Sequence, residues 1–413
     1  MRIRIKNIGI VANADVQIDG ISVIAGKNGT GKSTISKALY AAFNGFNNYD
    51  QRVERERETI VLRYLRNLEM DLLELNKFPE DLNSLLSFIL KNKENYTKNP
   101  VDLEKKLTDF FGISSDEQSI NTIKSTAEKI IDTLKIEKQQ IILRMVARRF
   151  DSEFGGQVKN VYNEDNGEIT LTVRDDDIRF TFSNSTVSLM HIPAIFEKEA
   201  IYIDASSVLD ENIYRVPIKQ YNHRSELTRK LFSSTETDEL TLDTILSEIK
   251  LKQAIEIINS ASSGHLTSNN KTAFGYELED GNIIDIKNTS EGLKTFAIIK
   301  ALLLSGEISE NGLLILDEPE IHLHPEWQLL FAEAIILIQK AFNLHILLST
   351  HSPYFLRAIQ VYAKKHEVDE RCNYYLSESS ADGNLVTNVG DNIELIYKQL
   401  SVPLQQLASE EWS

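Results

Sequence analysis

A glycine-rich loop near the start of the chain constrains the fold more than any other part of the sequence. Residues 26–33 read Gly-Lys-Asn-Gly-Thr-Gly-Lys-Ser, which fits the pattern G-x-x-x-x-G-K-S/T in full. The apolar run Ile21–Ala25 predicts a strand before the loop, and a helix is expected from about Lys32 to Asn44. Glycines let successive N–H groups point at an anion, and a helix N-terminus adds the positive end of its dipole. The pattern therefore predicts a phosphate-binding loop in an α/β fold.

The side chains of this loop suit the phosphates of a nucleotide. Lys32 is expected to contact the β- and γ-phosphates, and the hydroxyl of Ser33 is expected to bind Mg²⁺. A chance glycine turn is the alternative, but it has no reason to match the whole pattern between a strand and a helix. ATP and Mg²⁺ are the predicted ligands. The residues predicted to hold the phosphates are Gly26, Lys27, Asn28, Gly29, Thr30, Gly31, Lys32, Ser33 and Thr34.

A second apolar strand, Leu313–Leu316, ends in two adjacent carboxylates, Asp317 and Glu318. Two carboxylates at the end of a buried strand are costly unless a metal or a reaction needs them. Asp317 suits Mg²⁺, usually through water, and Glu318 suits the polarisation of an attacking water beside the γ-phosphate. A pair of acids that only caps the strand is the alternative. Together with the loop, this pair predicts ATP hydrolysis.

Two further segments are candidates for completing the site. Ser290 and Gly292 stand at the start of an expected helix, Gly292–Ser305, although an ordinary helix N-cap would also explain the serine. His351 follows the apolar strand His345–Ser349 and could donate a hydrogen bond to the γ-phosphate. A histidine in an ordinary turn is the alternative. The run from Ser290 to Lys294 resembles the signature segment of ABC ATPases, which has a Ser-x-Gly core followed by a basic residue, here Lys294. This resemblance, and the order of both segments relative to the acids, favours a role at the nucleotide.

Composition narrows the class of protein. The chain has 413 residues and a net charge of −16, so it is a poor non-specific DNA binder unless positive charge clusters locally. Three arginines, Arg144, Arg148 and Arg149, do cluster on a predicted helix. Lys138 lies one or two turns earlier, and a solvated helix face is the simpler interpretation. Cys372 is the only cysteine, and no apolar run reaches the roughly 18 residues of a membrane span. We expect a cytoplasmic protein with no membrane partner.

The pattern along the chain suggests three regions. Residues 1–45 and 270–413 alternate strands with helices, which predicts a mixed or parallel β-sheet flanked by helices, and the glycine-rich loop and the acids both lie in this region. Residues 46–155 are charged and helical and predict a helical insertion. Residues 156–269 predict an antiparallel lobe of β-hairpins with a helical lid. Hairpin turns are expected at Asn166-Gly167, Asp280-Gly281 and Asp382-Gly383.

The order of the motifs resembles that of ABC-type P-loop ATPase heads. The run Asp-Glu-Pro-Glu-Ile-His-Leu-His-Pro at residues 317–325 is similar to the RecF-like and overcoming-lysogenization-defect (OLD) branch, which is related to the SMC proteins. ATPases of bacterial anti-phage defence systems, such as Septu-type ATPase subunits, belong to the same branch. The resemblance covers residues 1–45 and 270–413 well and residues 47–269 loosely.

This resemblance implies that two chains close head to head around two ATP molecules. Each P-loop would then face Ser290 and Gly292 of the other chain, and a higher oligomer made of such dimers is compatible with this arrangement. His322 and His324 lie beside the acids and could suggest a metal site. Given the resemblance, we interpret their loop as a dimer contact instead.

The chain departs from the patterns of related proteins in three places. Glu291 and Leu293 replace the glycine and the glutamine that are usual in the transporter signature. Residues 205–207 hold the place of the usual Q-loop but offer no glutamine. Proteins of the OLD type carry a C-terminal Toprim nuclease domain, and the stretch after His351 is too short for one. Any nuclease would therefore be expected on a separate subunit.

The resemblance thus implies an ABC-type ATPase that dimerises around ATP. It would regulate or drive a partner effector, most simply a nuclease, in anti-phage defence or DNA repair. One alternative is an ATP-gated DNA clamp, which would bind nucleic acid. The other is an ATPase that energises a membrane transporter, and the long insertion and the His-Leu-His-Pro loop argue against it.

Overall fold

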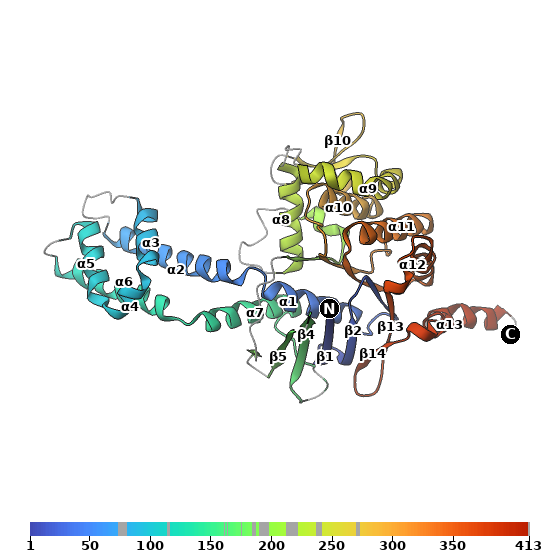
Figure 1. The fold of residues 1–413 in the computed structure, drawn as a ribbon, viewed down its shortest axis with the longest axis horizontal. Coiled ribbons are helices and arrows are strands. Elements are labelled where there is room, and N and C mark those ends of the chain that lie inside the picture. The colour runs from blue at the N-terminus through green and yellow to red at the C-terminus, as the bar shows by residue number, and fades with distance from the viewer. Residues whose placement is uncertain are drawn as a thin grey trace. The chain divides into compact units, whose positions relative to one another are not determined.

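The structure is a computed structural model. It describes the chain apart from residues 73–80, 114–115, 161, 163, 175, 184–186, 190–197, 212–221, 237–241, 270–272 and 412–413. The chain divides into two compact units (Figure 1), of which the larger combines Met1–Asn47 with Val146–Ser413 and the smaller is Asn48–Met145. We call the larger unit the head and the smaller unit the insertion. Within the described residues, every helix is too short or too polar to cross a membrane.

The head contains both sheets and most of the helices. Its strands are β1 (Arg2–Ile8), β2 (Val11–Gln17), β3 (Ile21–Gly26), β4 (Gly167–Val173), β5 (Asp176–Phe182), β6 (Val187–Leu189), β7 (Ala200–Ile203), β8 (His265–Asn269), β9 (Ala273–Glu277), β10 (Ile283–Asp285), β11 (Leu313–Asp317), β12 (His345–Thr350), β13 (Cys372–Glu378) and β14 (Asn384–Asn388). Its helices are α1 (Lys32–Gly45), α8 (His223–Glu236), α9 (Leu242–Ala261), α10 (Glu291–Leu304), α11 (Pro325–Phe342), α12 (Pro353–Lys365) and α13 (Glu394–Glu411), with short 3-10 turns at η2 (Ser206–Asp210), η4 (Ile286–Asn288), η5 (Asp369–Arg371) and η6 (Gly390–Asn392).

The main sheet of the head has 11 strands in the order β6-β5-β4-β1-β2-β14-β13-β3-β12-β11-β7. The strands from β13 to β7 are all parallel, whereas β6, β5, β4, β1 and β2 form an antiparallel half. Strand β14 joins the halves, because it is parallel to β2 and antiparallel to β13. The expected α/β fold with a mixed sheet flanked by helices is therefore confirmed.

The parallel strands lie in the centre of the head core. Every residue of β3, β7 and β11 is buried, as expected for parallel strands that are covered on both faces. Val23, Leu314 and Leu348 belong to one apolar cluster with residues of α8 to α12. Helix α1 also packs against these strands. Because these central strands are packed firmly, the loops at their ends start from fixed positions.

The insertion is helical, in agreement with the expected helical insertion. It contains α2 (Tyr49–Leu72), α3 (Leu82–Lys91), α4 (Lys93–Lys98), α5 (Pro100–Phe111), α6 (Glu117–Lys135) and the first part of α7 (Lys138–Phe154), which continues into the head. Val61 and Leu65 of α2 share an apolar core with Ile123 and Ile130 of α6. Asp116 caps α6 by accepting a hydrogen bond from the backbone N–H of Ser119, over 2.9 Å.

Two of the three expected hairpins are confirmed. Gly281 lies between the antiparallel strands β9 and β10 with φ +81°, and Gly383 lies between β13 and β14 with φ +111°. The hairpin expected at Asn166-Gly167 is wrong, because Gly167 begins β4 and pairs with Phe182 of β5. A Cβ atom at Gly167 would lie 2.9 Å from the carbonyl oxygen of Asn7. This glycine therefore serves a close approach between strands rather than a turn.

The strands expected in a separate lobe extend the main sheet instead. Strand β4 pairs with β1, and β7 pairs with β11 on the far side of the sheet. The alternating pattern of residues 158–163 also predicts a strand. In the structure Lys159 makes an isolated bridge to Ile8, while residues 161 and 163 lie outside the described residues. The lobe boundaries proposed for residues 156–269 thus differ from the compact units, because strand pairing links segments far apart in sequence.

Candidate active site

The predicted motifs meet at one edge of the sheet. Strands β3, β12 and β11 are parallel neighbours, with Thr350 beside Ala25 and Asp317 beside Ser349. Their carboxyl ends therefore lie side by side. The P-loop follows β3, the acids end β11, and His351 follows β12. Sequence motifs that are hundreds of residues apart are in this way brought to one place, as is usual for sites in parallel α/β sheets.

The glycine-rich loop has the backbone that a phosphate cradle requires. Gly29 and Gly31 have φ values of +77° and +97°, in the left-handed region that favours glycine. A Cβ atom at Gly31 would also lie 2.5 Å from a methyl group of Val11. The side chain of Lys32 is 3% exposed, and its Nζ donates to the carbonyl oxygens of Gly26 and Lys27 at 2.9 Å. The side chain of Lys32, from the first turn of α1, therefore folds back against the loop that precedes it.

Two residues that the sequence analysis missed brace this loop from β13 and β14. The hydroxyl of Ser377 donates to the carbonyl oxygen of Thr30 over 2.9 Å, and the amide of Asn384 donates to that of Gly29 over 3.0 Å. The Cβ of an alanine at Gly26 would lie 2.4 Å from the carbonyl oxygen of Ser377. The only sequence signal for this contact is the Asp382-Gly383 turn, which places the β13–β14 hairpin without indicating its neighbour.

Glu318 reaches the P-loop directly. Its Oε1 lies 2.9 Å from Nζ of Lys32, and its side chain is 18% exposed. Its backbone adopts φ +49°, a left-handed conformation that costs a non-glycine residue of order 1–3 kcal/mol. The N–H of Glu318 donates to the carbonyl oxygen and the hydroxyl of Ser349, both at 3.1 Å, which holds the strained turn. The turn aims the carboxylate at the loop.

Asp317 is held between the two strands that flank β11. Its Oδ1 accepts a hydrogen bond from the hydroxyl of Ser349 on β12, and its Oδ2 accepts one from the hydroxyl of Tyr202 on β7, over 3.0 Å. Burial raises the pKa of Tyr202 well above its ordinary value, so the phenol keeps its proton and donates. A fixed carboxylate together with the exposed hydroxyl of Ser33 gives an all-oxygen donor set, which suits Mg²⁺.

His351 lies between two glutamates. Its Nδ1 is 3.2 Å from Oε2 of Glu318 and 4.0 Å from Oε1 of Glu320. Glu320, which the sequence analysis did not single out, is 2% exposed and accepts hydrogen bonds from the hydroxyl of Thr350 and the N–H of His351. Burial raises the pKa of Glu320 above its usual range. The signal was present in the Asp-Glu-Pro-Glu run, where the fourth residue fixes the turn after β12.

The Ser-x-Gly segment is placed at the start of α10. Ser290 is exposed and caps the helix by accepting a hydrogen bond from the N–H of Leu293, over 3.2 Å. A Cβ atom at Gly292 would lie 3.0 Å from the carbonyl oxygen of His322 and 3.1 Å from the ring of Trp327. Glycine therefore allows α10 to approach the loop after the acids. The contacts described for Ser290 and Gly292 involve α10 and the start of α11, not the P-loop.

The departure from the transporter signature at Glu291 has structural partners. Glu291 accepts hydrogen bonds from Nζ of Lys294, over 2.7 Å, and from the hydroxyl of Ser206, which follows β7. Lys294 is 2% exposed and also bonds the carboxylate of Asp210 at 2.8 and 2.9 Å. The basic residue of the signature is thus used to join α10 to η2. His324 caps α11 by accepting a hydrogen bond from the N–H of Glu326, over 3.4 Å.

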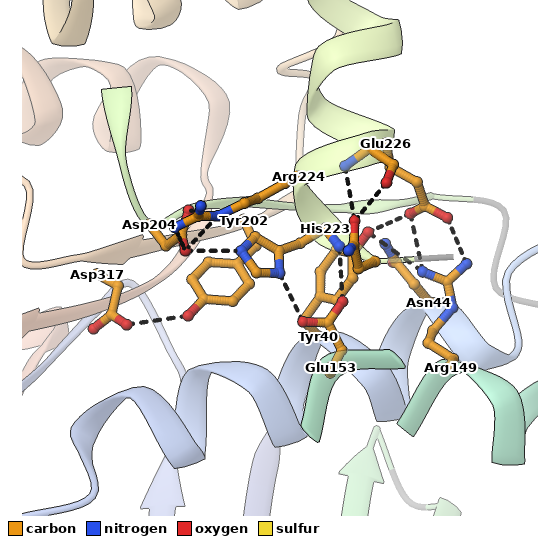
Figure 2. A network of polar contacts seen from close by, with 12 residues as sticks. Tyr40, Asn44, Arg149, Glu153, Tyr202, Asp204, His223, Arg224, Glu226 and Asp317 are labelled. Atoms are coloured by element: carbon orange, nitrogen blue, oxygen red, sulfur yellow. Dashed lines mark hydrogen bonds and ion pairs between the residues drawn. The ribbon is translucent and has the colours of Figure 1, made fainter. Parts of the chain in front are cut away.

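A buried polar network lies beside this site (Figure 2). Arg149, one of the arginines expected on a solvated face of the predicted helix, is 3% exposed and makes two hydrogen bonds to Glu226, at 2.9 and 2.7 Å. It therefore cannot contribute to an exposed basic patch, whereas Arg144 and Arg148 are exposed. His223 joins Glu153 and Asp204, with its Nδ1 2.6 Å from Glu153 and its Nε2 3.1 Å from Asp204. The sequence offered no local signal for these contacts.

The charge on His223 makes the stability of the head depend on pH. Burial by itself lowers the pKa of His223, but the hydrogen bonds and charges of Asp204 and Glu153 outweigh it and raise the pKa to about 9. A raised folded-state pKa gives stability that is complete below the unfolded pKa of about 6.5 and is lost as pH rises through about 9. We expect this loss to be about 3 kcal/mol.

Urea unfolding between pH 6.5 and 9 measures the effect. In His223→Gln, the decline of stability over this range should be smaller than in the unmodified protein. His265→Gln is the matched control, because the imidazole of His265 is 56% exposed and is paired with a single carboxylate, that of Glu277. An equal decline in His223→Gln and the unmodified protein would contradict the assignment.

Several known proteins are similar to this chain. A curated relative, the "Retron Vc95 probable ATPase" of Vibrio cholerae, is 32% identical over 93 residues, which cover 20% of this chain and 18% of that protein. Two similar solved structures are an SMC head bound to the C-terminal winged-helix domain of ScpA, with 9% identity and a TM-score of 0.41, and the SMC head of Thermotoga maritima, with 10% identity and a TM-score of 0.36. The first alignment covers 95% of this chain and the second covers 94%, and each covers 98% of the chain of the solved structure. Residues 21–357 match the family described as "AAA domain, putative AbiEii toxin, Type IV TA system", and the chain, a P-loop ATPase, belongs to this family.

Proposed function

We propose that the chain is an ATP-driven switch, which closes head to head with a second copy around two ATP molecules and controls a separate effector subunit. The observation that carries this proposal is the convergence of Lys32, Glu318 and His351, in direct contact beside Asp317. Lys32 would be the phosphate-binding cation and Glu318 the general base. His351 would be a hydrogen-bond donor and Asp317 a metal ligand, and these four functions are the set that ATP hydrolysis requires.

Each residue has a role that its position supports. The N–H groups of residues 26–33 and Nζ of Lys32 would hold the phosphates. Glu318 would accept a proton from the attacking water, and His351 would donate to the γ-phosphate. Ser33 and Asp317 would hold Mg²⁺, which when bound neutralises charge on the phosphates.

The dimer is supported by the exposure of Ser290. Ser290 is exposed at the N-terminus of α10, where the helix dipole favours an anion, while its own contacts lie within that segment. A second chain could therefore present its phosphates to this helix end. Gly292 would keep the start of α10 close to the loop with His322 and His324, and that loop would lie at the contact.

The effector part of the proposal rests on the names of relatives. The family description refers to a toxin–antitoxin system, and the local relative is named for a retron. Both names support a bacterial defence role in which an ATPase works with another component, for which a nuclease is the simplest choice. The match spans 18% of the length of the retron ATPase. Salt-dependent DNA binding by the ATP-loaded dimer would favour a DNA clamp instead.

Replacement of Lys32 by alanine tests the nucleotide site. A charge-assisted hydrogen bond contributes about 1.5–3 kcal/mol, so we expect ATP affinity to fall by roughly 10- to 100-fold. Equilibrium titration with a fluorescent ATP analogue measures the affinity, and circular dichroism checks the fold. Lys37→Ala removes a partly exposed lysine from the same helix and should bind normally. Normal binding by folded Lys32→Ala would overturn the assignment.

A further inference from the structure

We propose that Tyr202 is a positioning residue for the metal ligand Asp317, and that His223 holds Tyr202 in place. Neither residue lies in a recognised motif, and neither would touch the nucleotide. This inference rests on the proposed function, because it takes Asp317 to be the ligand of Mg²⁺. The orientation of that carboxylate is set by Tyr202 of β7 and by the polar network that surrounds the ring of this tyrosine (Figure 2).

The carboxylate of Asp317 is held at both oxygens. Ser349 donates to Oδ1 from β12, and Tyr202 donates to Oδ2 from β7, over 3.0 Å. These strands flank β11 on its two sides, so the two hydrogen bonds oppose rotation of the carboxylate about its Cβ–Cγ bond. Loss of one of them would leave the group free to turn away from a metal. Mg²⁺ is sensitive to such a change because it demands near-ideal octahedral geometry.

The phenol of Tyr202 is itself held by packing. Its side chain is 1% exposed, and its ring stacks on the imidazole of His223 with the ring centroids 4.1 Å apart and the planes at 27°. The ring of Tyr40, on α1, lies on it at a centroid distance of 5.8 Å. Tyr40 also contacts His223 edge-on, with the centroids 5.9 Å apart, so the three rings pack as one cluster that holds the ring of Tyr202 in place.

His223 is fixed by charges on two other elements. Glu153 of α7 accepts a hydrogen bond from the backbone N–H of His223, over 2.7 Å, and also lies 2.6 Å from Nδ1. Asp204, directly after β7, lies 3.1 Å from Nε2 and is held in turn by Arg224 at 2.7 Å. An imidazole bound at both nitrogens cannot rotate. Because burying the charged groups of His223 and Glu153, which are 7% and 0% exposed, is expensive, their arrangement around one aromatic stack indicates a demand for fixed geometry.

The chain offers a matched pair of tyrosines for the test. Tyr202→Phe keeps the ring stack and removes only the hydroxyl that bonds Asp317. Tyr40→Phe removes a buried hydroxyl of the same network, which bonds Glu226 and not Asp317. The two variants lose a similar hydrogen bond, but only the first loses the contact to the metal ligand. Any difference between them therefore reports on Asp317.

Metal binding is the direct readout. Mn²⁺ would be titrated into protein loaded with a non-hydrolysable ATP analogue, and its binding would be followed by its electron paramagnetic resonance signal. The Mg²⁺ concentration that gives half-maximal ATPase activity would be measured in parallel. We expect about a tenfold weaker Mn²⁺ affinity and a similarly raised Mg²⁺ requirement in Tyr202→Phe, since a hydrogen bond to a charged group contributes about 1.5 kcal/mol or more. Analogue binding in EDTA should not change, and Tyr40→Phe should match the unmodified protein.

A third variant separates this inference from the proposed function. Asp317→Asn should weaken Mn²⁺ binding strongly. If it does not, Asp317 is not the metal ligand and the proposed site fails. If Asp317→Asn weakens the metal but folded Tyr202→Phe binds Mn²⁺ as the unmodified protein does, only the positioning role of Tyr202 is overturned. His223→Gln removes the ring that stacks on Tyr202 and is expected to weaken Mn²⁺ binding in the same direction as Tyr202→Phe, and unchanged Mn²⁺ affinity in the folded variant would remove His223 from the proposal.

Discussion

Replacing Glu318 by glutamine is expected to lower the rate of ATP hydrolysis by about 10²–10⁴-fold, the usual contribution of a general base, while ATP still binds. Glutamine has nearly the same shape as glutamate, but its amide cannot take a proton from water. Oε1 of Glu318 lies 2.9 Å from Nζ of Lys32, so the substitution also removes a negative charge that competes with phosphate for the lysine. We therefore expect ATP affinity to be equal or higher.

A variant that binds ATP without cleaving it should accumulate in the dimeric state. Light scattering of Glu318→Gln with ATP should show twice the molar mass found without nucleotide, because a ligand shared by two chains links binding to association. Turnover is measured by phosphate release and affinity by titration. Glu333→Gln is the control, since Glu333 on α11 pairs with Lys365 and His366. Undiminished turnover of Glu318→Gln would remove Glu318 from the role of base.

The parts of the site that were predictable from sequence are those that local patterns encode. A loop that needs two left-handed glycines before a helix, or two acids after an apolar strand, leaves a signature within a few residues. Residues 26–33 and the pair Asp317 and Glu318 are of this kind. The hairpins at Gly281 and Gly383 were also predictable, since a turn with positive φ has a local cause.

The parts that were missed depend on contacts between distant segments. Tyr202 reads as one more apolar residue of a buried strand until β7 is known to lie next to β11. Ser377 and Asn384 brace the P-loop across the sheet, and Arg149 is buried because Glu226 of another helix meets it. The turn predicted at Gly167 was wrong for the same reason, since this position requires a glycine because of a neighbouring residue on β1. Local patterns do not carry this information.

Mixing two inactive variants should restore ATP hydrolysis, which is the most specific expectation of the head-to-head dimer. Ser290→Arg and Lys32→Ala would each be inactive alone, because every site of either homodimer carries a lesion. In a mixed dimer one site combines both lesions and the other has neither, since each P-loop is completed by the other chain. With random pairing, half of the dimers are mixed and each has one intact site, so about a quarter of normal activity is expected.

Helix stability must be separated from the contact with phosphate in this experiment. Ser290 caps α10, and loss of an N-cap costs about 1 kcal/mol. Ser290→Asp keeps a good cap but puts a negative charge where the γ-phosphate of the second chain is expected. It should therefore fold as well as the unmodified protein and still be inactive, and it should complement Lys32→Ala in the same way as Ser290→Arg does. Ser290→Thr, which keeps both the cap and the hydroxyl, should retain activity.

The outcomes of the mixing experiment discriminate between arrangements of the site. Restored activity would require Ser290 to act on the nucleotide of the other chain, because a role within its own chain cannot be complemented by a partner that lacks Lys32. Full activity of Ser290→Arg alone would exclude any role at the nucleotide. Native mass spectrometry, for example, would show whether mixed dimers form. If they form and remain inactive, either both sites must hydrolyse ATP together or each site is not shared between the two chains. Those two cases are distinguished by a tandem fusion with Lys32→Ala in one copy alone, which is inactive only if both sites must fire together.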